Sequence, residues 1–528
     1  MEKKINVLEV NNIDLPGRRF NGYDLMNNIE DENIHISQAV ILKQSKNDKV
    51  KQLLQNSELM QLLEKLEEFE NKELSIHSNL SITSPALIKS QAYKDADLIH
   101  FHMFHNTKLS LISLLQICSE KKVVMSFHDP WAITGRCVHF GECDKWKTGC
   151  IECKNLNTLF EFKEDNCNEM WKLKKMIYEK INPDIVVSSK YMYDLVKQSP
   201  LTKHFTNVHI IPLGVDLAFF NNKIQKEEAR KKFNIPDTDI VIFLRAQKAF
   251  KGTNYVVDAM KKLKTNKKIT ILTCDEKNRL DELKNKYNIV DMGRMNDKEL
   301  LYAYNACDIF LMPSIGETFG MMAIEAMACG KPVIIFNNTA LPDVTFAPEC
   351  GVLVENKNSD KLKEAIEHLI DNEEERKKRG ELGRKLCEEH YSIDKYNISL
   401  VNLYKKIKKT EHKKMNLDKI KYNTTDGIKI QSKLNKFTIA NFKENSEEYK
   451  SLIYKNIENI EGKINYADWN VQKIINEYNN NLYNVLENKK TNNIFVQVKN
   501  ALSLLIKDRS RLKNSIQYKF NQIFKKKD

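Results

Sequence analysis

The sequence predicts an α/β protein with two Rossmann-like domains facing a cleft, followed by a helical, basic C-terminal extension. Two observations indicate this fold. Short β-branched runs alternate with longer stretches of helical period through most of the first 400 residues, and these runs form two successive sets of about six. The chain has 528 residues, of which 41% are hydrophobic, so it can form two or three domains with substantial cores.

The first set of runs predicts an N-terminal Rossmann-like domain over residues 1–213. Buried strands are expected at 5–10, 39–42, 98–102, 123–127, 185–188 and 208–212. A cysteine-rich insertion, residues 131–155, follows the fourth of these strands. The motif IPLGVD ends the series, which places the seam between the domains near residues 214–220.

The second set predicts another Rossmann-like domain over residues 214–390. Its strands are expected at 240–244, 269–273, 289–292, 309–312, 333–336 and 351–354. Charged amphipathic helices at 359–370 and 374–389 close this domain.

A Lys- and Asn-rich segment, residues 409–528, forms the predicted helical extension. From residue 411 onward it holds 23 Lys and Arg against 13 Asp and Glu, so it carries +10 of the net charge of +13. Residues 498–527 form a basic amphipathic pattern, which predicts either peripheral contact with an anionic membrane or a helix packed on the domain. The rest of the chain is close to neutral and the tail has no known docking module, so no nucleic-acid partner is expected.

The absence of targeting signals predicts a cytoplasmic protein, at the inner face of the cell membrane if the tail binds there. No apolar run approaches the ~18 residues of a membrane span. The N-terminal residues MEKKINVLEV lack a signal-peptide pattern. The odd number of cysteines, 11, favours reduced thiols over a disulfide framework.

The stretch DIFLMPSIGETFGMMAIEAMACGKPV, residues 308–333, carries the clearest chemistry. It places Glu317 between a strand end and a helix, and Glu325 about two turns inside that helix, at the sheet edge where ligands bind. The helix start, around Phe319, Gly320 and Met321, offers unpaired N–H groups to an anionic diphosphate. Two carboxylates beside a phosphate site suit a sugar nucleotide. Alternatively, Glu317 is an exposed acid that interacts with the helix dipole.

This stretch closely resembles the motif PSxxETFGxxxxEAMAxGxPV of the retaining glycosyltransferases of family 4, with two glutamates separated by seven residues. The resemblance extends over roughly residues 1–405 and implies the GT-B type of fold. A second arrangement, HD-W-TGxC-CxxWKTGC-C, begins at His128 and resembles that of bacterial exopolysaccharide-type members of the family. The resemblance to the family implies that the first domain binds the acceptor, the second binds a nucleotide-diphosphate sugar, and residues 391–408 form a closing helix that returns to the first domain. Glu317, Thr318, Phe319, Gly320, Met321 and Glu325 are then donor-binding residues.

The resemblance also assigns catalytic residues outside this stretch. Arg245 and Lys251 would clamp the donor diphosphate, although Lys248 competes with Lys251 because the spacing departs from the family pattern. His128, directly after a predicted strand, would lie near the transferred sugar, with Asp129 beside it on the acceptor side. The expected catalytic set is therefore His128, Arg245, Lys251 and Glu317.

Two further segments carry polar residues of open role. Gly17, Arg18 and Arg19 follow the first strand, where the arginines could bind a phosphate of the acceptor or form a surface salt bridge. In the insertion, the four residues Cys137, Cys143, Cys150 and Cys153 could hold a structural zinc, with His139 as a substitute ligand, or be free or paired thiols.

The sequence thus predicts a hexosyltransferase that moves a sugar, with retention, from a nucleotide-diphosphate sugar to a saccharide or lipid-linked saccharide in surface glycan synthesis. The resemblance implies no cofactor for catalysis, and it makes Glu317 and Glu325 binding residues more than bases or nucleophiles. Two alternatives stay open. One is an inactive transferase-like partner subunit, and the other is a sugar-nucleotide epimerase or phosphorylase on the same fold.

Overall fold

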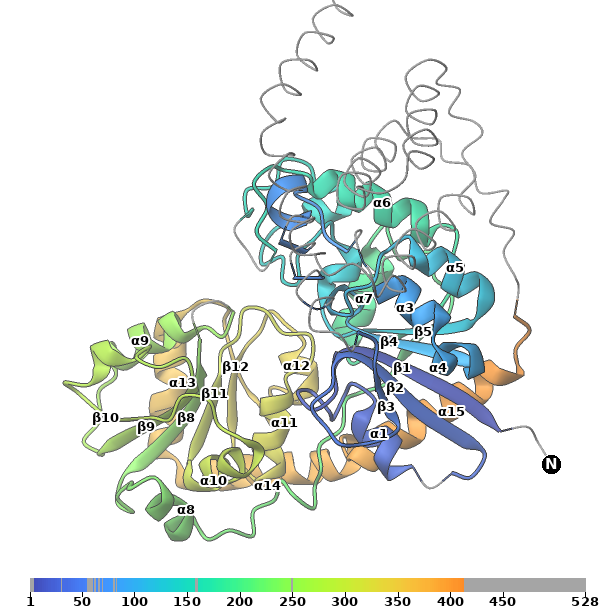
Figure 1. Ribbon diagram of the computed structural model, residues 1–528. Coiled ribbons are helices and arrows are strands. Elements are labelled where there is room, and N and C mark those ends of the chain that lie inside the picture. The colour runs from blue at the N-terminus through green and yellow to red at the C-terminus, as the bar shows by residue number, and fades with distance from the viewer. Residues whose placement is uncertain are drawn as a thin grey trace, which may run out of the picture.

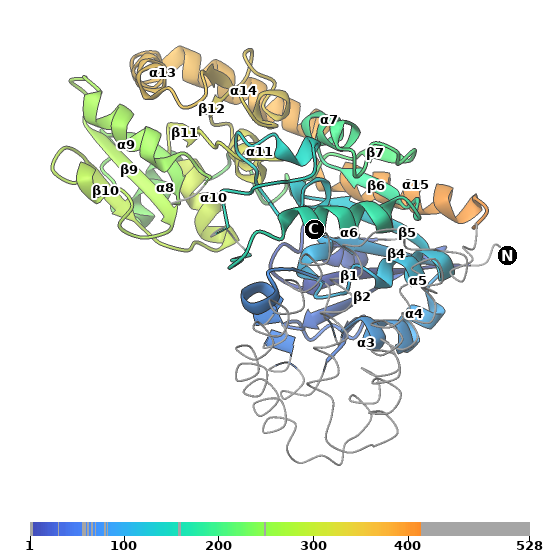
Figure 2. The ribbon, with the colours of Figure 1, turned by 90° about the horizontal axis from the view of Figure 1, so that it is seen from above.

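A computed structural model describes residues 4–412, except 30, 55–59, 61–62, 65–66, 69, 79–80, 82, 157–159 and 248–249. Two α/β units lie side by side, each with a parallel sheet covered by helices (Figures 1 and 2). The predicted two-domain α/β fold is therefore confirmed. The tail beyond residue 412, including the basic pattern at 498–527, lies outside the described residues.

The first sheet has seven parallel strands in the order β3-β2-β1-β4-β5-β6-β7. They are β1 (Ile5–Ile13), β2 (Ile34–Leu42), β3 (Val50–Gln52), β4 (Leu98–His102), β5 (Lys122–Phe127), β6 (Asp184–Val187) and β7 (Val208–Ile210). Its helices are α1 (Tyr23–Asn28), α3 (Thr83–Lys89), α4 (Gln91–Asp95), α5 (Ser113–Glu120), α6 (Cys167–Tyr178) and α7 (Lys190–Gln198). All six predicted strands are present, and β3 is an edge strand that sequence analysis missed.

The second sheet has six parallel strands in the order β10-β9-β8-β11-β12-β13. They are β8 (Ile240–Ala246), β9 (Ile269–Asp275), β10 (Asn288–Asp291), β11 (Ile309–Met312), β12 (Val333–Phe336) and β13 (Val352–Val354). The helices are α8 (Lys226–Lys232), α9 (Thr253–Lys262), α10 (Asp297–Ala306), α11 (Met321–Ala328), α12 (Leu341–Val344), α13 (Ser359–Asp371) and α14 (Glu373–His390). Each of the six strands overlaps its prediction.

Burial explains why the central strands were the easiest to predict. Every residue of β4, β11 and β12 is buried. Parallel strands with helices on both faces are apolar along their whole length, so they appear in a sequence as continuous runs of β-branched and aromatic residues. The carboxyl ends of these strands point toward the boundary between the two domains, which positions the loops of the candidate site.

The chain crosses between the domains twice, and the two crossings pair with each other. The backbone N–H of Val215 donates to the carbonyl of Tyr391 over 2.7 Å, and that of Ile393 donates to the carbonyl of Val215 over 3.0 Å. A Cβ added at Gly214 would lie 2.5 Å from the Cα of Ile393, so glycine permits this approach. From there α15 (Ile393–Lys409) runs back along the first domain (Figure 1).

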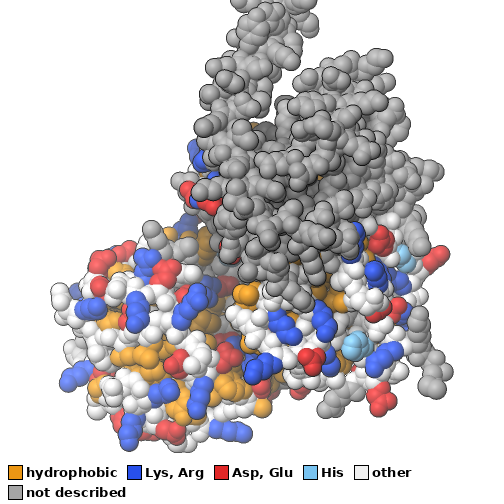
Figure 3. Space-filling view, in the orientation of Figure 1, with side chains coloured by type: hydrophobic (Ala, Val, Ile, Leu, Met, Phe, Trp, Pro, Cys, Tyr) orange, Lys and Arg blue, Asp and Glu red, His pale blue; other side chains and the backbone are white. Residues whose placement is uncertain are grey.

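The surface of the described part mixes charges of both signs. On the face shown in Figure 3, Lys and Arg side chains are interspersed with Asp and Glu around a hollow between the domains. No helix among the described residues is long and apolar enough to cross a membrane.

Candidate active site

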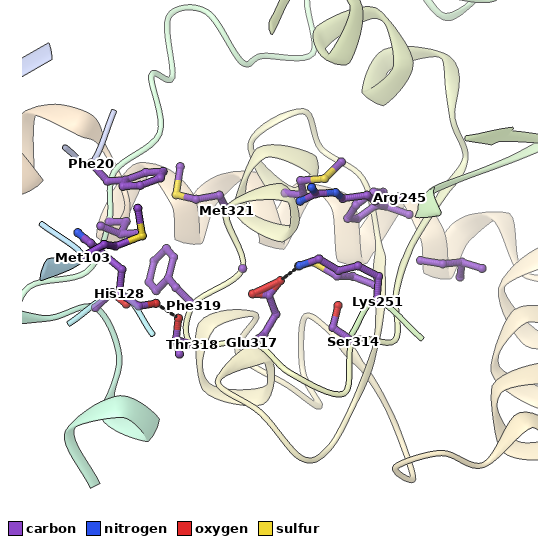
Figure 4. Close-up of a pocket in the computed structure, with 17 residues that line it drawn as sticks. Phe20, Met103, His128, Arg245, Lys251, Ser314, Glu317, Thr318, Phe319 and Met321 are labelled. Carbon is purple, nitrogen blue, oxygen red and sulfur yellow. Dashed lines mark hydrogen bonds and ion pairs between the residues drawn. The ribbon is translucent and has the colours of Figure 1, made fainter. Parts of the chain in front are cut away.

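A cavity of about 280 Å³ lies between the two domains, at the carboxyl ends of both sheets. Phe20, Met103 and His128 form its first-domain wall, and Figure 4 shows them facing Arg245 and Lys251 of the second domain. The floor comes from the loop between β11 and α11. The second-domain lining includes Arg245, Lys251, Ser314, Glu317, Thr318, Phe319, Gly320, Met321 and Met322.

Lys251 and Glu317 form an ion pair in this cavity (Figure 4). Both side chains are mostly buried, with 16% and 13% of their surfaces exposed. Next to Lys251, the backbone of Gly252 packs closely against the loop that carries Glu317. A Cβ at Gly252 would lie 1.9 Å from the carbonyl oxygen of Pro313. Gly252 has φ +71°, so glycine suits this position on both counts. The contact brings the loop after β8 against the loop after β11.

Arg245 is the residue before the last of β8 and lines the same cavity as Lys251. Its Nε donates to a carboxylate oxygen of Asp275 over 2.7 Å, and 39% of the side chain is exposed. That bond uses one of the five N–H donors of a guanidinium, so the group retains donors for an anion. Lys248, the alternative to Lys251, lies outside the described residues.

The mouth of α11 opens onto the cavity. Its first turn has backbone N–H groups without intrahelical partners, and Thr318, Phe319, Gly320 and Met321 all line the space beside it. Gly320 has φ +106°, and a Cβ there would lie 2.4 Å from the Leu341 side chain. The mouth of α11 thus opens on the same cavity as two cations, Arg245 and Lys251.

Glu325 does not line this cavity. Its buried carboxylate accepts a hydrogen bond from the Tyr304 hydroxyl over 2.8 Å and forms an ion pair with Arg19. Burial raises the pKa of Glu325 although the charge of Arg19 opposes the rise. The structure therefore brings Glu317, Arg245 and Lys251 together and places Glu325 behind them.

The arginines of the loop after β1 form salt bridges. Arg19 also pairs with Asp297 at 2.8 Å, and Arg18 lies 3.7 Å from both Asp24 and Asp297. Gly17 occupies a turn of this loop with φ +74°. The residues that line the cavity do not include Gly17, Arg18 or Arg19.

His128 reaches the cavity from the loop after β5. Its backbone carbonyl accepts a hydrogen bond from the Thr318 hydroxyl over 2.6 Å, and Ser189 donates to the Thr318 carbonyl over the same distance. Thr318 therefore ties the second domain to two loops of the first. Asp129 points elsewhere, because its carboxylate accepts from the backbone N–H of Trp131 and lies 3.3 Å from His105.

A buried cluster behind His128 escaped sequence analysis. Glu9 on β1 lies 2.7 Å from Nε2 of His102 and accepts a hydrogen bond from the Tyr404 hydroxyl of α15 over 2.8 Å. His100, on the same face of β4, contacts Tyr404 and Ser126. Burial alone would raise the pKa of Glu9, but the two histidines outweigh it and lower that pKa to about 2. The sequence signal for this cluster was the pair of histidines at alternate positions of one strand, His100 and His102. Glu9 gave no such signal, because it lies in an apolar run and its partners are distant in sequence.

One group of possible metal ligands combines Cys153 of the predicted set with residues outside it. Ligand atoms of Cys153, Asp165 and Cys167 lie within 4.8 Å of one another, and Cys167 had not been included in the predicted set. The Asp165 carboxylate also accepts from the backbone N–H groups of Cys153 and Cys167, over 2.6 and 3.1 Å. Two thiols and a carboxylate are a donor set that zinc accepts. Whether Cys137, Cys143 and Cys150 join them stays a prediction.

His139 of the same insertion packs on the second domain. Its ring lies 4.3 Å from that of Phe250 and its Nδ1 would be 3.1 Å from a Cβ at Gly316. Glu142 of the insertion forms an ion pair with Lys357 over 2.5 Å. The insertion therefore bridges the domains next to Lys251 and Glu317.

Residues 225–386, most of the second domain, match the family described as glycosyl transferases group 1. An uncharacterized glycosyltransferase, MJ1178, of Methanocaldococcus jannaschii is 32% identical over 180 residues, which are 33% of this chain and 50% of that protein. The putative colanic acid biosynthesis glycosyl transferase WcaC of Escherichia coli is 24% identical over 265 residues, 47% of this chain and 61% of that one.

The chain thus spans about half to six tenths of the length of these curated relatives. Among solved structures, Alr3699/HepE of Anabaena in complex with UDP and glucose is similar in fold, with a TM-score of 0.52 and 14% identity. The alignment covers 77% of this chain and 100% of that one. The similarity supports the GT-B arrangement of two facing Rossmann-like domains.

Proposed function

We propose that this protein is a retaining glycosyltransferase that transfers a hexosyl group from a nucleotide-diphosphate sugar to a saccharide or lipid-linked saccharide. The observation that carries the proposal is the convergence of Arg245, Lys251, Glu317 and the mouth of α11 on one cavity between the domains. Two cations beside free helix amides suit a diphosphate, and an adjacent carboxylate suits sugar hydroxyls. Relatives named as glycosyltransferases and a fold neighbour bound to UDP and glucose support this choice.

In the proposed reaction, Arg245 and Lys251 neutralise the charge that develops on the leaving diphosphate. Electrostatic stabilisation of this kind is usually the largest contribution to catalysis, and it needs no catalytic metal here. Glu317 binds hydroxyls of the donor sugar once a diphosphate competes for Lys251. His128 faces the transferred group from the acceptor side.

Retention is proposed to occur by departure and attack on one face of the sugar, with the leaving phosphate taking the proton of the acceptor hydroxyl. Paired carboxylates that flank the bond are the alternative in retaining glycosidases. The position of Glu325 argues against that alternative, because its carboxylate is engaged by Arg19 and Tyr304 behind the cavity. The proposed roles of Glu317 and Glu325 are therefore in binding.

The relative named for colanic acid biosynthesis favours a surface glycan as the product. We propose that the reaction takes place in the cytoplasm, and at the inner face of the membrane if residues 498–527 bind lipid. Either location gives access to nucleotide sugars.

A donor panel tests the proposal. Purified protein is incubated with UDP-, GDP- and dTDP-sugars, with and without lipid-linked saccharides, and release of nucleotide diphosphate is measured together with the anomeric configuration of the product. Acceptor-dependent release with retention is expected. Release without glycosyl transfer, or conversion of the donor to another sugar nucleotide, would favour a phosphorylase or an epimerase. No turnover with any pair would favour an inactive partner subunit.

A further inference from the structure

We infer that Glu9 and His102 are positioning residues that fix the proton arrangement of His128, leaving its Nδ1 unprotonated to accept a hydrogen bond from a sugar hydroxyl in the cavity. The inference rests on the proposed transfer reaction. It adds two residues that no substrate would touch.

The three side chains form a continuous hydrogen-bonded chain from the sheet interior to the cavity. Glu9 lies on β1, His102 at the end of β4 and His128 directly after β5, and these strands are neighbours in the sheet. The Glu9 Oε2 to His102 Nε2 distance is 2.7 Å, and the His102 Nδ1 to His128 Nε2 distance is 3.2 Å. The two imidazole planes are nearly parallel, at 8°. His128 lines the cavity, whereas Glu9 and His102 are buried.

Hydrogen-bond donors and acceptors can be assigned along this chain from Glu9 outward. An ionised carboxylate accepts only, and Glu9 already accepts the Tyr404 hydroxyl hydrogen at Oε1, so Nε2 of His102 must donate to Oε2. A neutral imidazole carries one N–H, so Nδ1 of His102 is an acceptor. Nε2 of His128 then donates to it, and the lone pair of His128 resides on Nδ1.

The surroundings keep both imidazoles neutral. Burial is the main cause that lowers the pKa of His102 to about 4 and that of His128 well below its ordinary value. The charged forms of His100, His102 and His105 would also repel a proton on His128, and together with burial they outweigh a hydrogen bond to the Phe20 backbone that would raise this pKa. Across the cavity, the charged groups are Arg245 and the Lys251–Glu317 pair.

The loop after β1 holds this chain in place. A Cβ added at Gly22 would lie 2.6 Å from the carboxyl carbon of Glu9, and Gly22 has φ +85°. The Phe20 ring lies 5.3 Å from that of His128. Glu9, His100 and His102 also have ligand atoms within 4.8 Å, a spacing that a metal could use. Both Glu9 oxygens instead take part in hydrogen bonds, Oε2 with Nε2 of His102 at 2.7 Å and Oε1 with the Tyr404 hydroxyl.

Two measurements test the inference. In the first, two-bond ¹H–¹⁵N spectra of the ¹⁵N-histidine-labelled protein, assigned with a His128→Gln variant, give the His128 tautomer at pH 7.5. The Nε2–H form is expected. The Nδ1–H form would overturn the inference. Because the tautomer is measured on the wild-type protein, the result depends neither on the folding of a variant nor on knowledge of the sugar donor.

In the second measurement, Glu9→Gln is compared with Ser126→Ala, which removes a hydrogen bond to His100 from the same buried region. We expect Glu9→Gln to mix the His128 tautomers and lower kcat about tenfold or more, while the KM for the donor changes less than about twofold. Ser126→Ala should keep the tautomer and kcat. Unchanged kcat and tautomer in Glu9→Gln would refute the positioning role. Absence of transfer by the wild type would count against the proposed function instead.

Discussion

Arg19 of the first domain forms an ion pair with Glu325 of α11 in the second domain. The Arg19 side chain is 18% exposed and the Glu325 side chain 3%. The guanidinium carbon of Arg19 also lies 5.1 Å from the ring centroid of Phe220. The loop after β1 thereby contacts the helix whose mouth opens on the cavity. Two roles were predicted for Arg18 and Arg19, phosphate binding and a surface salt bridge. In the structure both arginines form salt bridges, and that of Arg19 is largely buried.

Arg19→Ala should destabilise the protein far more than Arg18→Ala. Removing Arg19 leaves the Glu325 charge buried without its cation, which costs on the order of 3–5 kcal/mol. Arg18 is half exposed and lies 3.7 Å from its carboxylates, so its loss should change the free energy of unfolding by less than about 1 kcal/mol. Urea denaturation of the three proteins measures both values. Equal effects of the two variants would contradict this role of Arg19.

Lys251→Ala and Glu317→Gln should each lower turnover by about a hundredfold or more without changing the fold. Either substitution removes one partner of the ion pair that lines the proposed donor site, and lost electrostatic contacts of this type typically cost 10²–10³ in rate. Steady-state kinetics with the best donor measures the loss, and circular dichroism checks the fold. Lys190→Ala, at an exposed pair on α7, serves as the control and should retain activity. Near-normal turnover in either site variant would refute the assignment.

Most of the fold could be predicted because its strands are buried on both faces. β4, β11 and β12 match their predicted bounds, since an apolar run with abrupt polar ends leaves little choice of limits. β3 was missed because three residues at a sheet edge, one buried and two more exposed, give no periodic signal. The seam near residues 214–220 and the limits of the domains stay predictions, which are based on the alternation of strand-like and helical runs in the sequence.

The site was predictable where it depends on one continuous segment, and less so where it depends on contacts between segments. Glu317 lies on the loop between the end of β11 and the start of α11, a position fixed by local sequence. The partner of Glu325 is 306 residues away, and Glu9 meets His102 across 93 residues. Spacing carries no information on such encounters. Cys167 likewise joins Cys153 because α6 begins beside the insertion, outside the cysteine pattern.

Stability should fall as the pH is lowered from about 6.5, in part because of His102. Burial lowers the pKa of His102 from 6.5 to about 4, so between these values the unfolded chain binds a proton that the folded chain excludes. The pKa of Glu9, lowered from 4.5 to about 2, extends the loss to lower pH with the same sign. Each group contributes at most about 1.4 kcal/mol per pH unit.

Urea denaturation at several pH values between 7.5 and 4.5 measures this dependence. His102→Gln should have a shallower slope than the wild type below pH 6.5, whereas His368→Gln, at an exposed position on α13, should keep the wild-type slope. Identical slopes in all three proteins would show that His102 takes up its proton equally in both states.

Zinc, if bound, should depend on Cys153 and Cys167. We expect protein purified without chelators to contain about one zinc per chain, because two thiols and a carboxylate already converge and further cysteines are close in sequence. Cys153→Ser and Cys167→Ser should lower that content, measured by inductively coupled plasma mass spectrometry. Cys118→Ser, on α5, is the control and should keep it. Wild-type protein with no zinc above the buffer level would establish that these cysteines are thiols.

Deletion of residues 498–528 should release the protein from anionic vesicles. This segment carries nine Lys and Arg against two Asp, and each basic residue near an anionic surface contributes about 1 kcal/mol, a term that salt screens. Co-sedimentation with vesicles containing 30% phosphatidylserine (roughly −30 mV at the surface) should therefore be strong at low salt and weak at high salt. A full-length variant with Lys525, Lys526 and Lys527 changed to Gln separates charge from length, since it should bind with intermediate strength. Binding that survives the deletion would assign membrane contact to another part of the chain.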